Sequence, residues 1–292
     1  MLRDRVQRRE ERDNILILCR SQPPADAEIM VTIAANLQAV RERIARAARG
    51  VGRHPGDIAL VAVSKTFPAE RIAQAYAAGH RAFGENFAQE AVEKITHLRD
   101  LALERRVAQA RRENNGERSD AIIPSAGVAS PEGPLLLPLE WHFIGPIQSN
   151  KTGLIAVHFQ WVHSVEREKV AQRLNAARPD RLPPLNVCIQ VNVSGEAVKS
   201  GVAPGEAVKL AEAVSRLPRL KLRGLMGIPE PTSDMALRRR RFAVLRELKN
   251  GLGARGFALD TLSMGMSDDL EAAIAEGSTM VRVGTAIFGK RT

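Results

Sequence analysis

Short apolar runs alternate with longer segments of helical periodicity along most of this 292-residue chain. Runs of this length, bounded by turn-forming residues, are typical of buried strands. Eight of them predict strands: Asp57–Lys65, Arg81–Phe83, Trp141–Ile144, Trp161–Ser164, Asn186–Val193, Leu222–Ile228, Thr261–Met264 and Val281–Val283. Helical patterns precede or separate these runs, including Ala34–Ala48, Ala69–Ala78, Glu168–Ala177, Gly205–Arg216, Ala236–Leu252 and Asp268–Glu276.

Regular alternation of strand and helix is the pattern of a parallel sheet. Eight strand–helix units in about 235 residues fit a closed (β/α)8 barrel, the TIM barrel, better than an open doubly wound sheet. A dinucleotide-binding sheet would carry a GxGxxG loop after an early strand, and the sequence has none there. We therefore predict an α/β fold made of one TIM barrel.

Two segments interrupt this pattern. Residues 1–29 hold six arginines and six acidic residues without a sustained apolar face, and we expect a disordered, dispensable extension. Met30 opens the helical pattern that follows, so a start codon assigned too far upstream would explain the segment; a regulatory arm is the alternative. Residues 99–139 predict a low-complexity insertion whose early part, 98–112, could extend a helix. The barrel is then residues 30–292.

The composition is that of an ordinary soluble globular protein, with 44% hydrophobic and 26% charged residues. No apolar stretch approaches the ~20 residues needed to span a bilayer, and Ile15–Leu18 is too short for a signal peptide. Cys19 and Cys188 are far apart, which favours a reducing cytoplasm over a disulfide framework. The histidines form no HExxH or Cys–His cluster. We expect a cytoplasmic monomer without a metal site or a membrane partner.

The net charge of +10 raises the question of a nucleic-acid partner. The densest basic run, Arg238–Arg241, lies in a helical pattern and is better explained as a solvated helix face. Aromatic residues make up only 4% of the chain, so platforms for stacking bases are scarce. We expect no nucleic-acid partner; the basic charge would help to attract phosphorylated ligands.

Lys65 ends the first predicted strand, at the edge of the barrel where such folds carry their chemistry. A lysine whose pKa is readily shifted by burial suits Schiff-base formation. A lysine that simply reaches from a strand end into solvent is the alternative. Asn86 follows the second strand and would place an amide near Lys65.

The clearest candidate for an anion site is the loop after the last strand, where Arg282 is followed by Gly284 and Thr285. Glycine lets the backbone turn closely, and N–H groups at the start of the next helix can bind a phosphate. A plain turn with Thr285 as the N-cap is the alternative. Ser263 and Met264 end the neighbouring strand.

One further motif, Gly145–Thr152, nearly matches the GxxxxGK[ST] phosphate loop. Asn150 replaces its second glycine and Pro146 removes a backbone donor, so a nucleotide triphosphatase is disfavoured. A phosphate loop and a strand-tip lysine at one barrel mouth suggest a phosphorylated aldehyde or ketone bound as an imine. Pyridoxal phosphate is the leading candidate, and a Schiff-base aldolase acting on a phosphosugar is the next.

Several motifs together resemble one family, the pyridoxal phosphate homeostasis proteins, over about residues 30–98 and 140–292. They are Val63–Thr66, Phe83–Asn86, His142–Pro146, Leu222–Met226, Ser263–Ser267 and Arg282–Gly289. The resemblance implies a single barrel of PLP fold type III, like the N-terminal domain of alanine racemase but without its second β domain. It implies a cofactor carrier and regulator of vitamin B6 and amino-acid balance, with no established reaction and with PLP-dependent apo-enzymes as candidate partners.

By this resemblance Lys65 forms the Schiff base with pyridoxal 5′-phosphate. The region of Ser263, Met264, Gly284 and Thr285 holds the phosphate, and Asn86 and Arg282 are candidates for the ring. Phe67 departs from the pattern, because close bacterial relatives often have a second lysine there.

A PLP-dependent amino-acid racemase or decarboxylase is the alternative on the same barrel. A two-base racemase needs a tyrosine from a second domain, whereas the single tyrosine of this chain, Tyr76, falls in a helical pattern.

Overall fold

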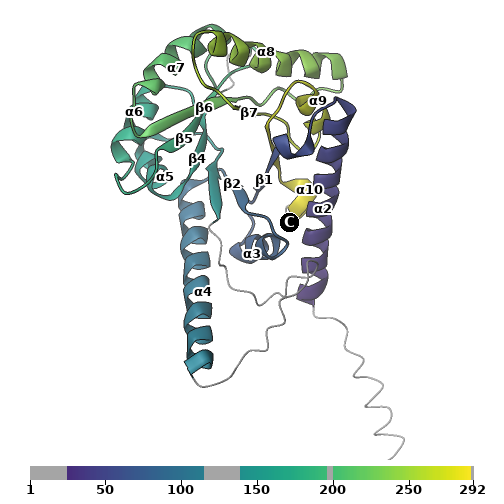
Figure 1. Cartoon of the computed structure of the whole chain (residues 1–292), viewed down its shortest axis with the longest axis vertical. Helices are drawn as coiled ribbons and strands as arrows, with labels where there is room; N and C mark the ends of the chain where they lie inside the picture. Colours follow the sequence, from purple (N-terminus) through teal and green to yellow (C-terminus); the bar gives the residue numbers. More distant parts are fainter. Residues whose placement is uncertain (1–24, 115–138, 196–199, 291–292) are drawn as a thin grey trace, which may run out of the picture.

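The protein forms a closed barrel of eight parallel strands in sequence order, as seen in a computed structural model that describes residues 25–114, 139–195 and 200–290 (Figure 1). Each strand pairs with the next along the chain, and β8 closes the barrel against β1. The predicted TIM barrel is therefore confirmed. The strands are β1 Ala59–Val63, β2 Ala82–Glu85, β3 Glu140–Phe143, β4 Trp161–Val165, β5 Leu185–Gln190, β6 Leu220–Met226, β7 Thr261–Ser263 and β8 Met280–Val283.

Helices surround this barrel, and the two longest, α2 and α4, run along opposite sides of α3 (Figure 1). Three 3-10 turns lie among the connections. The helices are α2 Ala25–Gly50, α3 Ala69–Ala77, α4 Ala88–Asn114, α5 Thr152–His158, α6 Glu168–Ala177, α7 Ala207–Ser215, α8 Met235–Ala254, α9 Leu270–Ala275 and α10 Thr285–Phe288. The 3-10 turns are η1 Pro55–Asp57, η2 Ser149–Lys151 and η3 Pro204–Glu206.

One helix boundary differs from the sequence-based expectation, and another follows it. α2 begins at Ala25, inside the segment expected to be a disordered extension, because Ala25, Ala27 and Glu28 are strong helix formers that continue the pattern upstream. α4 continues to Asn114, so the early part of the expected insertion is a helix. The expectations for residues 1–24 and 115–138 lie outside the described residues.

Most strands are also shorter or shifted relative to the apolar runs, and three of them show how. β1 ends at Val63, before Lys65, and β6 lies two residues upstream of the predicted run. β5 ends at Gln190, because the chain beyond it makes only an isolated bridge between Val191 and Val202. Apolar residues continue past the end of the ladder here, so hydrophobicity alone overestimates the strand.

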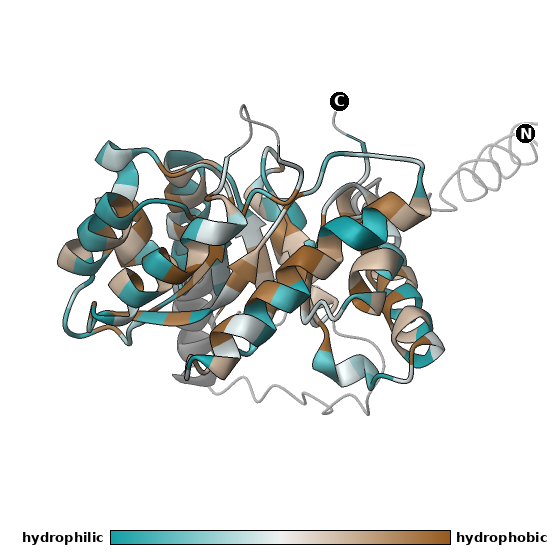
Figure 2. Ribbon diagram, turned by 90° about the horizontal axis from the view of Figure 1, so that it is seen from above, coloured by the Kyte–Doolittle hydropathy of each residue, from teal (hydrophilic) through white to brown (hydrophobic). Residues whose placement is uncertain are grey.

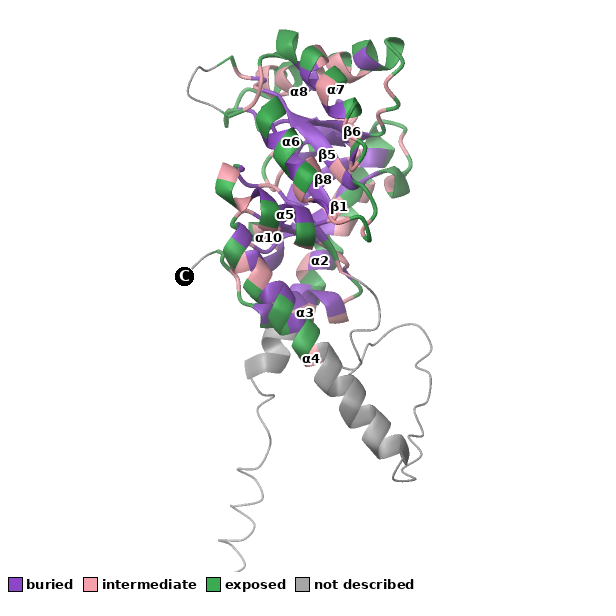
Figure 3. Ribbon diagram, turned by 90° about the vertical axis from the view of Figure 1, so that its left-hand side faces the viewer, coloured by how far each residue is buried: buried purple, intermediate pink, exposed green. Residues whose placement is uncertain are grey.

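The core has two layers, one on each face of the barrel wall. A large cluster lies between the strands and the helices and includes Ala62, Phe83 and Phe143. A smaller cluster fills the inside of the barrel and contains Val61, Trp161, Cys188, Met226 and Met280. Buried residues accordingly concentrate on the strands in Figure 3, and helices carry apolar and polar positions side by side in Figure 2. This alternation decides which side chains reach the barrel interior.

Candidate functional site at the mouth of the barrel

Strand alternation places most of the predicted site residues at the inner, carboxyl end of the strands. Val61 faces the interior, so Lys65, four positions later, continues the same face where β1 gives way to a turn. A Cβ on Gly84 would lie 3.0 Å from Val61, which marks Gly84, and hence Asn86, as inward too. Ser263 and Arg282 meet across β7 and β8. Lys65, Asn86, Ser263 and Arg282 thus share the end of the barrel at which such folds carry their sites.

Met264 is the exception among the predicted residues. Its side chain is buried in the cluster between strands and helices, on the opposite face from Ser263. Its backbone is engaged as well: its N–H donates to the Met280 carbonyl at 3.1 Å, and its carbonyl accepts from the Ser278 hydroxyl at 2.7 Å. The side chain of Met264 therefore lies away from the barrel interior, because neighbouring residues of a strand point to opposite faces, and its contact with a cofactor stays a prediction.

The backbone that follows Lys65 is strained. Thr66 has φ +66°, a conformation that is uncommon for any residue with a Cβ and strained for a β-branched one. Its N–H donates to Glu90 Oε1 at 2.6 Å, and the Phe67 N–H donates to the Ser64 carbonyl at 3.1 Å. Glu90, from the start of α4, therefore holds the peptide next to Lys65 in its unusual turn.

A buried ionic cluster supports the other side of Lys65. Lys94 Nζ donates to the Ser64 carbonyl at 2.9 Å and lies 2.9 Å from Glu85 Oε1 and 2.6 Å from Glu90 Oε1. Ser64 Oγ also donates to Glu85, at 2.7 Å. Burial raises the pKa of the Glu85 carboxyl, and the charge of Lys94 opposes that rise. We call Ser64, Glu85, Glu90 and Lys94 the α4 clamp.

Sequence reasoning missed the α4 clamp. One local signal was available: Glu90 and Lys94 are spaced i, i+4 in the helix that follows β2. Nothing local shows that this pair reaches back to β1. Its position between strand and helix makes it a support for Lys65 rather than part of the mouth.

Asn86 presents a polar atom with no hydrogen-bond partner among the residues that the structure describes. Its Oδ1 is buried and accepts no hydrogen bond, which is costly unless a ligand or water supplies a donor. The backbone at Gly145 passes very close to the backbone of Asn86, since a Cβ on Gly145 would lie 2.2 Å from the Asn86 carbonyl oxygen. The first glycine of the near-match to the phosphate loop is therefore explained by this close approach.

Arg282 is a buried cation at the centre of the β7–β8 side. Burial lowers the pKa of its guanidinium to about 10, which leaves it charged at neutral pH. It donates to Ser263 Oγ at 2.6 Å and to the Gly227 carbonyl at 3.2 Å. Both acceptors are neutral, and no carboxylate within the described residues forms a salt bridge with it. A buried charge in this setting favours an anionic or strongly polar ligand.

The Gly284–Thr285 turn adjoins Arg282 and has the expected form. α10 begins at Thr285, and the N–H groups of Ile287 and Phe288 both donate to the Gly284 carbonyl at 2.9 Å. The N–H groups that open a helix have no partner within it and are available to an anion. A Cβ on Gly284 would lie 3.2 Å from the Val63 carbonyl oxygen, so this turn packs tightly against the end of β1.

Other candidates from the sequence lie elsewhere. The arginine run on α8 makes contacts within the protein: Arg238 donates to the Asp268 carbonyl, Arg239 pairs with Glu276, and Arg241 pairs with Glu230. Cys188 is buried inside the barrel, and burial raises its pKa to about 12. Over the described residues there is no cluster that could hold a metal ion, and no helix there is long and apolar enough to cross a membrane.

The residues at the mouth fit a phosphorylated aldehyde. Lys65 supplies the amine, the Gly284–Thr285 turn supplies donors for a phosphate, and Arg282 supplies a buried positive charge. Asn86 Oδ1 supplies an acceptor that the protein itself leaves unused. Each functional group of such a ligand therefore has a counterpart on a different strand end.

Comparisons with known proteins agree with this geometry. Residues 35–292 match the family model of the alanine racemase N-terminal domain. Among curated relatives, the pyridoxal phosphate homeostasis protein of Pseudomonas aeruginosa is 54% identical over 90% of this chain and 97% of its own length. That of Escherichia coli K12 is 50% identical over 90% and 98%.

Solved structures show the same fold. PipY of Synechococcus elongatus, solved with PLP bound, is 32% identical with a TM-score of 0.68 and covers 88% of this chain and 100% of its own. Alanine racemase of Corynebacterium glutamicum, at 17% identity and a TM-score of 0.54, shares the fold; the match covers 90% of this chain but 61% of the racemase.

Proposed function

Because the chain belongs to the family of pyridoxal phosphate homeostasis proteins, we propose that it binds pyridoxal 5′-phosphate and buffers, stores or delivers it without catalysing a reaction of its own. We further propose that it acts in the cytoplasm and that PLP-dependent apo-enzymes receive the cofactor. The observation that carries the proposal is the convergence of Lys65, the unpartnered Asn86 Oδ1 and the buried Arg282 at one end of the barrel.

Each residue has one part in this proposal. Lys65 forms the covalent link, and the N–H groups of the Gly284–Thr285 turn, with the Thr285 hydroxyl, hold the phosphate. Asn86 and Arg282 face the ring, with Ser263 supporting Arg282. When bound, the cofactor supplies an aldehyde carbon that bonds to amines and a ring that can withdraw electrons. A cation such as Arg282 next to the ring nitrogen opposes its protonation and so weakens that withdrawal, which suits a carrier better than a catalyst.

The racemase alternative is weakened by the position of the tyrosine. Tyr76 lies in α3, outside the barrel wall, with the Arg81 guanidinium 3.8 Å from its ring centroid. It is 8% exposed and packs in the helical layer, away from the strand ends that carry Lys65 and Arg282. A second base opposite Lys65 would have to come from another residue.

Reductive trapping tests the proposal. Protein loaded with pyridoxal phosphate is reduced with borohydride, digested and analysed by mass spectrometry, and the label is expected on Lys65. Lys65→Ala should abolish covalent loading, whereas Lys169→Ala, at an exposed lysine on α6, should leave it unchanged. Label on another lysine with Lys65→Ala fully loaded would overturn the assignment.

A transfer assay separates the carrier from the enzyme. Loaded protein is mixed with a PLP-dependent apo-enzyme while a competing trap removes free cofactor, and recovery of the apo-enzyme is expected to exceed that with free cofactor alone. Turnover of L- to D-alanine above the rate of free cofactor, lost in Lys65→Ala, would favour the racemase instead.

A further inference from the structure

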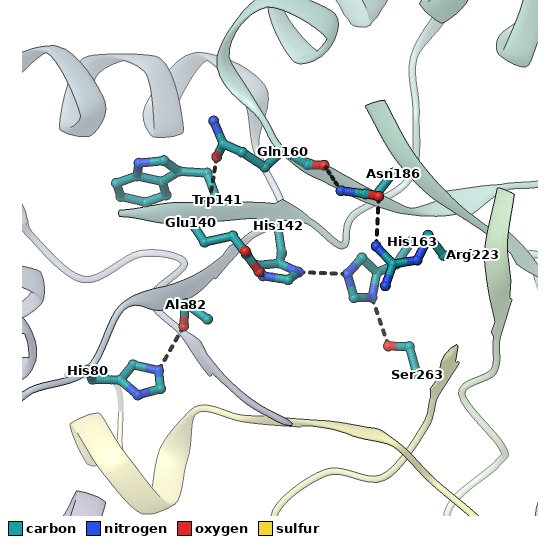
Figure 4. A network of polar contacts seen from close by, with 10 residues as sticks. All are labelled: His80, Ala82, Glu140, Trp141, His142, Gln160, His163, Asn186, Arg223 and Ser263. Carbon is teal, nitrogen blue, oxygen red and sulfur yellow. Dashed lines mark hydrogen bonds and ion pairs between the residues drawn. The ribbon is translucent and has the colours of Figure 1, made fainter. Parts of the chain in front are cut away.

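A continuous chain of hydrogen bonds runs through the barrel from Arg282 toward the amino end of β3. Arg282 Nη1 donates to Ser263 Oγ at 2.6 Å, and Ser263 Oγ lies 2.7 Å from His163 Nδ1. His163 Nε2 lies 2.9 Å from His142 Nδ1, and His142 Nε2 lies 2.7 Å from Glu140 Oε1. Figure 4 shows the part from Glu140 to Ser263. Its five members come from four strands: β3, β4, β7 and β8.

A guanidinium can only donate and an ionised carboxylate can only accept. Burial favours neutral rings for both histidines, and with neutral rings the carboxylate end fixes the direction of every bond. His142 donates from Nε2 to Glu140, His163 donates from Nε2 to His142 Nδ1, and Ser263 donates its proton to His163 Nδ1. Each neutral ring then carries its one proton on Nε2.

The surroundings favour the same state. His142 and His163 are fully buried, and burial lowers the pKa of both rings, for His163 well below its usual value. Trp161 stacks on His142, with ring centroids 5.5 Å apart. Glu140 is half-exposed, and its bond with His142 lowers its pKa, so it stays ionised near neutral pH. The charge therefore stays at the ends, and the centre of the barrel stays neutral.

We infer that this chain is a one-directional hydrogen-bond relay that holds Arg282 in the orientation in which it meets the cofactor ring. His163, His142 and Glu140 are then positioning residues, and this role rests on the proposed function. Arg282 has five N–H donors, and Ser263 and Gly227 fix two of them. While its proton points to His163, the Ser263 oxygen keeps a lone pair directed at Arg282. Loss of His163 frees the hydroxyl to rotate, and Arg282 loses its fixed partner.

The first test is made on the parent protein, and substituted proteins serve only to assign its resonances. Imidazole 15N shifts of the apo-protein at pH 7.5 report the protonation state of each ring, with resonances assigned by single histidine substitutions. His142 and His163 are expected to be neutral with the proton on Nε2. A proton on Nδ1 of His163, or a doubly protonated ring at either position, would overturn the relay.

The second test compares three variants. His163→Phe removes both polar ring atoms and should weaken cofactor binding by about tenfold or more, as expected when a hydrogen bond to a charged group is lost. His163→Gln keeps one donor and one acceptor and should stay within about threefold of the parent. His80→Gln is the matched control, because His80 is buried but bonds to the Ala82 carbonyl, outside the relay. It should also stay within about threefold.

The outcomes separate the relay from the proposed function. A parent protein that does not load the cofactor would refute the proposed function, while the 15N shifts would still judge the relay. A parent that loads normally, with His163→Phe binding as tightly as His80→Gln, would refute the relay alone. Equal weakening in all three variants would show a general packing effect and would also refute it.

Discussion

The two sides of the barrel mouth are supported differently: at β1 and β2 the backbone around Lys65 is held from outside the barrel, whereas at β7 and β8 the side chain of Arg282 is held from inside it. Glu90 and Lys94 of α4 bind the backbone on either side of Lys65. Arg282 is fixed through its side chain by Ser263 and the histidines behind it. The first support is ionic and holds a strained turn, and the second is neutral between its two charged ends, Arg282 and Glu140.

This difference follows from what each residue has to do. Under the proposed function Lys65 forms and releases a covalent bond, which requires a fixed backbone and room for the side chain to react. Arg282 would only present a donor, so its side chain itself can be fixed. Buried ions give rigid geometry but make the structure depend on every partner, because removing one leaves the other charged and unpaired. A neutral relay depends less on any one charge.

The largest effect is expected from Lys94→Met, which tests the ionic side. The change removes the cation from buried Glu85 and releases the Ser64 carbonyl. We expect the free energy of unfolding to fall by about 3–5 kcal/mol in urea titrations at pH 7. Glu85→Gln added to Lys94→Met should restore part of this loss, while Lys169→Met at an exposed position should change little. A loss below about 1 kcal/mol would show that the clamp is not an ionic support.

Acid is expected to destabilise the strands that carry the relay before it destabilises the strands next to the α4 clamp. Burial lowers the pKa of His142 and His163, and burial also lowers that of His80, to about 4. Below the unfolded value of about 6.5 the unfolded chain binds protons that the folded chain does not, so stability falls as pH drops from 6.5 toward 4. For His80 alone the loss is roughly 3 kcal/mol at the lower limit. Glu85 acts in the opposite sense, because a raised carboxyl pKa makes the folded state relatively more stable in acid.

Urea titrations between pH 7 and 4.5 measure this slope. His163→Gln removes one buried ring of the relay and should flatten the slope, whereas His80→Gln removes only the separate contribution of His80, outside the relay. Hydrogen exchange at pH 5 should increase at β3 and β4 before it increases at β1. Exchange that rises first at β1 would reverse the contrast between the two sides.

Much of the barrel could be predicted from the sequence, because buried strands and amphipathic helices are local patterns. Candidate residues at the barrel mouth could be predicted where they lie at the end of a strand, as Lys65 and Gly284 do. The side chain of Met264 lies on the outer face, because a shift of one residue along a strand moves a side chain to the other face, and a strand-end pattern alone does not show this. The relay could not be predicted from the sequence, because His163 and Ser263 are hydrogen-bonded although 100 positions separate them.

The α4 clamp shows a second limit. The backbone of Thr66 adopts a left-handed conformation that its side chain disfavours, and only Glu90, 24 positions away, explains why it persists. A sequence pattern records what a residue prefers, not what its distant neighbours impose. Strain of this kind becomes visible only when both elements are placed.

A smaller effect on the free energy of unfolding is expected from Thr66→Asn, which tests the strain in the turn after Lys65. Asparagine tolerates positive φ better than a β-branched residue, so relief of strain is expected to raise the free energy of unfolding by about 1 kcal/mol. Thr66→Val keeps the branched Cβ and should give no gain. Thermal unfolding of the three proteins at pH 7 measures the difference. Equal stabilities would mean that the bond from Glu90 sets the turn without residual strain.

The smallest effect is expected at the far end of the relay. Glu140→Gln keeps an oxygen that accepts from His142 Nε2 and removes only the charge, and the side chain is 48% exposed. Solvent screening at such a position limits the loss of stability to about 0.5 kcal/mol. Glu140→Leu instead leaves the His142 N–H without an acceptor and should cost about 1–3 kcal/mol. Urea titrations at pH 7 distinguish the two variants. If Glu140→Gln lost as much as Glu140→Leu, the charge of Glu140 rather than its hydrogen bond would anchor the relay, and both sides of the mouth would depend on charged side chains.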